Sequence, residues 1–159
     1  MLVDHAIEIT VPFAELSRLL LDNPERWLPK VAAGAQRREG ELLTDVGFEV
    51  AHLRVDKRVG IEILSLVRTQ SSVVLLVRWK AHGGTRLFPV FEGSLEVTPI
   101  DGYRSRLLVS GEYQPPGGEL GRIGDRALLH RVATATIRDF NERIAALMLN
   151  STRPQDATT

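Results

Sequence analysis

The sequence has no cysteine, no excess charge of either sign and no long apolar run. The absence of cysteine excludes disulfide bonds, thiolate nucleophiles and zinc sites built on sulfur. The 20 basic residues balance the 20 acidic ones, so no net field attracts nucleic acid or an anionic membrane. No segment approaches the roughly 18 apolar residues of a membrane span, and MLVDHAIEIT does not resemble a signal peptide. We therefore expect a cytoplasmic protein without nucleic-acid or integral membrane association.

Motifs of several enzyme classes are also missing. The four histidines, His5, His52, His82 and His130, show no HExxH spacing, so we expect no metal site. There is no GxSxG elbow, no GxxxxGK phosphate loop and no GxGxxG after a strand. The glycine-rich GGELGRIG follows two prolines and lacks the phosphate-loop lysine. The sequence thus gives no reason to expect a cofactor.

The size and composition are those of one globular domain. The chain has 159 residues, of which 43% are hydrophobic and 25% are charged. We expect a single domain over residues 1–149. The segment 150–159, NSTRPQDATT, is polar, contains a proline and has no periodicity, which predicts a disordered tail.

The N-terminal residues predict a strand followed by two short helices. The residues expected on one strand face are Val3, His5, Ile7, Ile9 and Val11. Pro12 ends that strand, and FAELSRLLLD has apolar residues at helical spacing. In NPERWLPKVA, Asn23 suits an N-cap and Pro24 the first helical position, while Pro29 should keep this second helix brief or kinked.

Residues 35–114 read as a meander of strands separated by turns at REGE, VDK, TQSS, AHGGT and IDGY. Asp101-Gly102 is the strongest hairpin signal. Strands joined by such short turns must be antiparallel, because a parallel return needs a long crossover. The segment Arg37-Arg38-Glu39 is expected in a solvated turn.

A long helix is expected over residues 119–149, about 45 Å in length at 1.5 Å per residue. Its predicted inward stripe is unusual because it mixes apolar and polar side chains. Its members are Ile123, Arg126, His130, Ala133, Thr134, Ile137, Phe140, Ile144 and Met148. Polar groups at buried positions need a protein, water or ligand partner.

This order of elements resembles the helix-grip superfamily, which includes START lipid-transfer domains and birch-pollen-allergen-like proteins. It is most similar to the bacterial polyketide cyclase/dehydrase (SRPBCC) group. The segments that carry the resemblance are IEITVP, DNPERWLPKV, FEGSLEVTPIDGYRSRLLVSGEY and LGRIGDRALLHRVATATIRDFNERI. The resemblance implies an α+β fold in which a curved, mainly antiparallel sheet of about seven strands surrounds the C-terminal helix.

The resemblance also implies a cavity between the sheet and the leading half of that helix, for an apolar, lipid-like or aromatic molecule. The side chains expected to line it are Val77, Trp79, Ile123, Arg126, His130, Thr134 and Ile137. Four of these residues also have a simpler structural explanation. His130 and Arg126 can pair with neighbouring protein groups, Thr134 can hydrogen-bond to its own helix, and Trp79 can be a core residue.

Three functions remain open at this point. The first is small-molecule binding in the cavity. The second is a polyketide cyclase or dehydratase in which His130 and Arg126 polarise a carbonyl. The third is a protein-interaction module that uses a sheet edge or the helix near Trp27, and a homodimer is one form of it. If Trp27 has no such role, it either caps the cavity or anchors its own helix.

Overall fold

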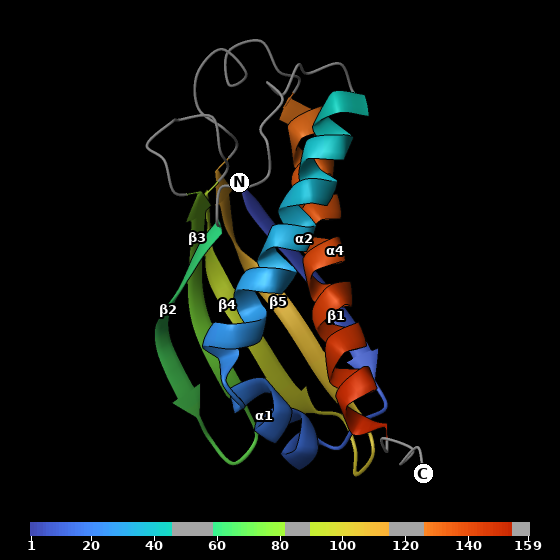
Figure 1. Ribbon diagram of the computed structural model, residues 1–159. Helices are drawn as coiled ribbons and strands as arrows, with labels where there is room; N and C mark the ends of the chain where they lie inside the picture. The colour runs from blue at the N-terminus through green and yellow to red at the C-terminus, as the bar shows by residue number, and fades with distance from the viewer. Residues whose placement is uncertain (46–58, 82–89, 115–125, 154–159) are drawn as a thin grey trace, which may run out of the picture.

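The computed structural model describes residues 1–45, 59–81, 90–114 and 126–153 (Figure 1). The elements in these residues are β1 (Leu2–Ile9), α1 (Phe13–Leu21), α2 (Pro24–Asp45), β2 (Val59–Arg68), β3 (Val73–Ala81), β4 (Val90–Pro99), β5 (Ser105–Gln114) and α4 (Arg126–Thr152). The expected α+β class is confirmed, with one sheet and a long C-terminal helix.

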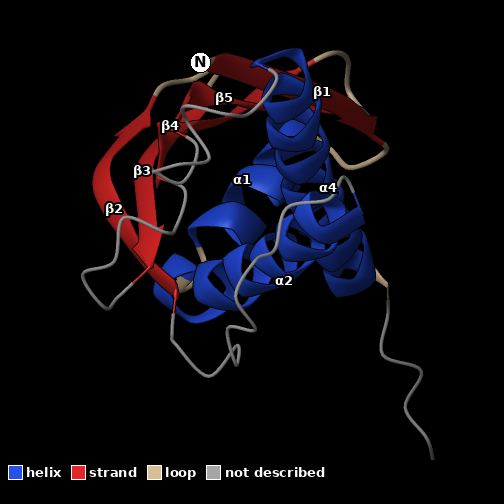
Figure 2. Cartoon of the chain, turned by 90° about the horizontal axis from the view of Figure 1, so that it is seen from above, coloured by secondary structure: helices blue, strands red, loops and turns tan. Residues whose placement is uncertain are grey.

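The strands form one sheet in the order β1-β5-β4-β3-β2, and every neighbouring pair is antiparallel. Figure 2 shows this sheet bent around the helices. The prediction of about seven strands is wrong for the described part of the chain, which has a five-stranded sheet. The break expected at VDK and most of that at AHGGT lie outside the described residues.

Part of this difference in strand count arises because α2 is much longer than expected. It runs for 22 residues with Pro29 inside it, so REGE is helical. The proline removes one backbone donor, but the following AAGAQRREGELL is rich in strong helix formers. The stripe of α2 formed by Leu28, Ala32, Ala35 and Glu39 is buried, and α2 packs mainly against α4. Helix packing therefore outweighs the interruption by Pro29.

Small residues on α2 allow a close approach between the two helices. A Cβ atom added to Gly34 would lie 2.8 Å from Nη1 of Arg143 on α4. The guanidinium of Arg143 is in turn held by Asp139, whose Oδ2 lies 2.6 Å from Nε. Figure 1 shows α2 and α4 side by side near the end of α2 and farther apart near its start.

Two predicted hairpins are confirmed. At Asp101-Gly102, Oδ1 of Asp101 accepts hydrogen bonds from the backbone N–H groups of Tyr103 and Arg104, both at 2.8 Å. This closes the connection between β4 and β5, which pair from Pro99 opposite Ser105 onwards. At TQSS, the N–H of Thr69 donates to the carbonyl of Ser72 at 2.8 Å and links β2 to β3.

The C-terminal helix is confirmed, and it ends at Thr152, three residues later than expected. Its C-terminal part buries the predicted apolar residues Ile137, Phe140, Ile144 and Met148. They pack in one core with the inner face of the sheet.

Asn141 joins α4 to two strands of the sheet. This fully buried side chain donates from Nδ2 to the carbonyl of His5 on β1 at 2.8 Å and to that of Leu107 on β5 at 3.2 Å. Nδ1 of the His5 ring also lies 3.2 Å from Nδ2. One amide thus fixes the position of the helix on the sheet.

We predict that Asn141→Ala lowers the free energy of unfolding by about 2–3 kcal/mol, because two buried carbonyls lose a donor. Urea unfolding of the variant and the natural protein measures this difference. Asn150→Ala, at an exposed position on the same helix, is the control and should change stability by less than about 0.5 kcal/mol. Equal stability of the two variants would contradict the prediction.

Candidate functional site

The residues predicted to bind a ligand do not gather at one place. Val77, Trp79 and Ile137 are buried in the core with no exposed surface. Arg126 and His130 are exposed on the first turns of α4. The ligand-binding role of these residues stays a prediction.

Of the two remaining predicted residues, Thr134 is half-buried and Ile123 lies outside the described residues. The sequence suggested that Thr134 hydrogen-bonds to its own helix. A bond of this kind is made by Thr136, whose hydroxyl donates to the carbonyl of Val132 at 2.9 Å.

The expectation that Arg126 and His130 face inward is wrong because the first turns of α4 bury a different flank. Leu129 and Val132 are the buried residues there, and they pack against Met1 and Leu42. Leu42 belongs to the part of α2 that the sequence had assigned to strands and turns. The extended α2 therefore determines which side of the leading half of α4 is covered.

Trp79 is part of an aromatic cluster in the core. Its ring lies 5.1 Å from that of Phe91 and 4.9 Å, edge to face, from that of Phe140, measured between centroids. This is the core-packing role that the sequence left open. Nε1 of Trp79 is buried and has no hydrogen-bond partner in the described part of the chain.

Glu39 is a buried acid that the sequence reasoning missed. Only 2% of its surface is exposed, although the sequence placed it in a solvated turn. The hydroxyl of Tyr113 on β5 donates a hydrogen bond to Oε1 of Glu39. Tyr113 itself pairs with Phe91 across the β4–β5 ladder, so Glu39 lies beside the aromatic cluster.

Burial raises the pKa of Glu39 from 4.5 to about 8. The side chain is therefore mostly a neutral acid at pH 7, with one O–H group to donate. Perturbed carboxyl groups often occur at functional sites, but structural burial produces the same shift. The burial of Glu39 follows from the spacing Leu28, Ala32, Ala35, Glu39 once the helix is allowed to continue past Pro29.

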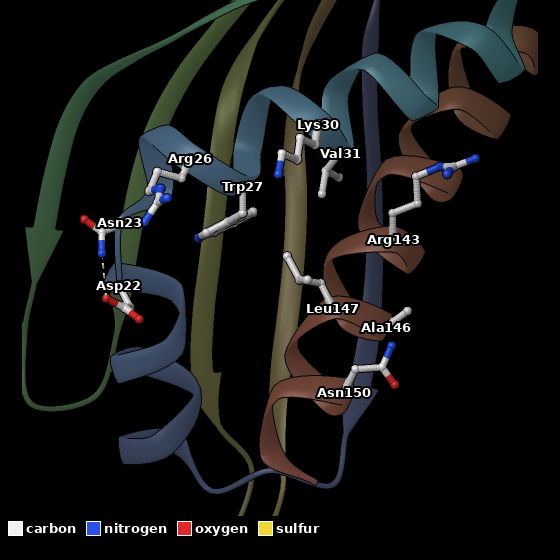
Figure 3. Close-up of a pocket in the computed structure, with 10 residues that line it drawn as sticks. All are labelled: Asp22, Asn23, Arg26, Trp27, Lys30, Val31, Arg143, Ala146, Leu147 and Asn150. Atoms are coloured by element: carbon white, nitrogen blue, oxygen red, sulfur yellow. Dashed lines mark hydrogen bonds between the residues drawn. The ribbon is translucent and has the colours of Figure 1, made fainter. Parts of the chain in front are cut away.

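A separate, open cleft lies between the start of α2 and the end of α4 (Figure 3). Its volume is about 650 Å³. Trp27 and Val31 project from α2, and Leu147 projects from α4 toward them. The other lining residues are Asp22, Asn23, Arg26, Lys30, Arg143, Ala146 and Asn150.

The cleft combines an apolar wall with polar groups at its rim. Trp27 and Leu147 pack partly against the main core, which fixes the wall. Nε1 of Trp27 is buried and has no hydrogen-bond partner among the described residues. The N-terminal turns of α2 bring in Arg26 and Lys30, both exposed. The sequence had named Trp27 as a cap or an anchor, but gave no sign that α4 would lie opposite it.

Other site types find no support in the described residues. In that part of the chain, no group of three or more His, Asp or Glu side chains could hold a metal ion. None of the helices described is long and apolar enough to cross a membrane.

No family model and no curated protein matches the sequence. Among solved structures, a conserved protein from Geobacillus kaustophilus is 21% identical, covers 93% of this chain and 95% of its own, and has a TM-score of 0.53. That likeness concerns the fold alone, and it agrees with the bent antiparallel sheet and the long C-terminal helix. The fold is of the helix-grip kind.

Two other similar structures have lower scores. A hypothetical protein from Helicobacter pylori is 12% identical, covering 90% of this chain and 87% of its own, with a TM-score of 0.45. The Zhui aromatase/cyclase from Streptomyces sp. R1128 is 13% identical, covering 97% of this chain and 96% of its own, with a TM-score of 0.44.

The buried Glu39 should make the stability of the protein depend on pH. The folded pKa of about 8 lies above the ordinary value of 4.5, so ionisation favours the unfolded chain. The stabilising contribution is complete below pH 4.5 and is lost as the pH rises to about 8, by up to about 1.4 kcal/mol per pH unit.

We predict that Glu39→Gln removes this loss and makes the protein more stable by about 3 kcal/mol at pH 7. Urea unfolding between pH 5 and 8 measures the dependence. The control is Glu41→Gln, an exposed position on α2 whose carboxylate pairs with Arg38 at 3.0 Å. The prediction fails if the Glu39→Gln profile runs parallel to that of the natural protein.

Proposed function

We propose that the protein binds one small molecule with a largely apolar body in the cleft between α2 and α4. The observation that carries the proposal is the cleft itself, whose volume of about 650 Å³ suits a small ligand. Binding sites for small molecules usually enclose about 300–1,000 Å³ and are lined by apolar and aromatic side chains with a few polar groups. Trp27, Val31 and Leu147 provide the apolar part here.

Rigid support on both sides favours this site. The start of α2 is anchored by Leu28, and the end of α4 by Ile144 and Met148, all of them buried. A wall that is already in place loses little conformational entropy when a ligand binds. The small-molecule function inferred from the resemblance thus moves from the leading half of α4 to the other end of that helix.

The enzyme hypothesis stays a prediction. It needs Arg126 and His130 beside a substrate carbonyl in an enclosed space. Both side chains are exposed, and neither lines the cleft. The geometry therefore favours binding over the cyclase chemistry.

We predict that Leu147→Gln weakens binding of the neutral fluorescent probe N-phenyl-1-naphthylamine by about fivefold or more, because the apolar wall loses a side chain. A fluorescence titration gives the dissociation constant. Leu149→Gln is the matched control, since Leu149 is exposed on the same helix and does not line the cleft. Absence of probe binding to the natural protein, or equal affinities for both variants, would reject the proposal.

A second candidate function is association with another copy of the chain. Exposed apolar side chains at one edge of the sheet favour it. They are Leu64, Leu66, Val67 and Leu76, each at least 40% exposed. β2, which supplies three of these residues, ends the order of strands in the sheet. Unpaired strand edges and exposed apolar patches are common interaction sites.

If this edge of the sheet joins two copies, light scattering should show a mass that rises with concentration, and Leu66→Lys should abolish the rise. Leu2→Lys is the control, because Leu2 is 80% exposed on the opposite edge strand. A constant monomer mass for the natural protein would dismiss self-association.

A further inference from the structure

Two cations stand one helical turn apart at the start of α2. Arg26 and Lys30 are separated by four residues, both are exposed, and both line the cleft. Neither takes part in an ion pair within the described part of the chain. Like charges at this spacing destabilise a helix, and the N-terminal end of a helix dipole is itself positive. The local arrangement therefore leaves positive charge uncompensated.

The remaining charged groups of the cleft do not remove that excess. Arg143 is occupied by Asp139, which does not line the cleft. Asp22 is the acid in the lining, and its Oδ1 accepts a hydrogen bond from Asn23 at 3.0 Å. Two unpaired cations thus face one acid.

Trp27 connects this charge to the apolar wall. It lies between Arg26 and Lys30 in the sequence, and its indole ring forms part of the wall. Its Nε1–H is buried, so the ring offers the cleft an apolar face rather than a donor. Positive charge therefore lies next to apolar surface within one cleft.

We infer that the occupant of the cleft is an amphiphilic anion, with an aromatic or aliphatic body and one acidic head group such as a carboxylate or sulfonate. This inference rests on the proposed function and specifies its ligand class. The body lies against Trp27, Val31 and Leu147. The head group lies at the rim, where Arg26 and Lys30 neutralise it.

Two fluorescent probes that differ by one sulfonate test the inference. They are 8-anilinonaphthalene-1-sulfonate, an anion, and N-phenyl-1-naphthylamine, its neutral counterpart. We expect the anionic probe to bind about five- to tenfold more tightly at low ionic strength, since each exposed ion pair contributes modestly to affinity. Added salt should reduce this preference.

The double variant Arg26→Gln with Lys30→Gln should lose the preference for the anionic probe and keep its affinity for the neutral one. Arg138→Gln is the control, because Arg138 is exposed on α4 and does not line the cleft. Equal affinity of the natural protein for both probes, or an equal loss of both in the double variant, overturns the inference while the proposed function stands. Failure of both probes to bind overturns the two together.

Discussion

The side-chain amide of Asn141 is the point at which α4 is tied to two strands at once. Its donors reach the carbonyls of His5 and Leu107, so the helix can neither slide along the sheet nor turn without losing buried hydrogen bonds. The residues that follow on α4, Arg143 and Leu147, are placed by this constraint on one side of the cleft. The same helix then offers α2 a surface to pack on. The position of α4 on the sheet, and with it one side of the cleft, is therefore set in part by one polar side chain in an apolar interior.

The length of α2 is the second determinant of the structure. Because the helix continues to Asp45, its later turns cover the flank of α4 that carries Leu129 and Val132 and leave Arg126 and His130 exposed. The same continuation places Glu39 in the interior, where burial alone raises the pKa of its carboxyl group. The start of α2 forms the cleft, and its end encloses an acid, so one helix separates two very different environments.

The sequence was informative where the signal is local. Alternation predicted β1, and the Asp101-Gly102 turn predicted the β4–β5 hairpin, because a side chain there can close the turn by itself. Pro29 was misleading, since its local cost is real but is outweighed by packing against α4, which begins at Arg126, far along the chain. The cleft could not be predicted from the sequence for the same reason, because its two sides come from distant parts of the chain. Nothing near Trp27 in the sequence indicates that Leu147 will stand opposite it.

Gly34 lies on α2 at the point where Arg143 of α4 approaches it. The guanidinium of Arg143 occupies the space that a Cβ atom would need, and there it is retained by Asp139. Even a methyl group at this position would displace the guanidinium of Arg143. The displaced guanidinium, which already borders the cleft, would then be available to it as a third mobile charge. The absence of a side chain at Gly34 thus leaves room for the guanidinium of Arg143 beside α2, where Asp139 pairs with it.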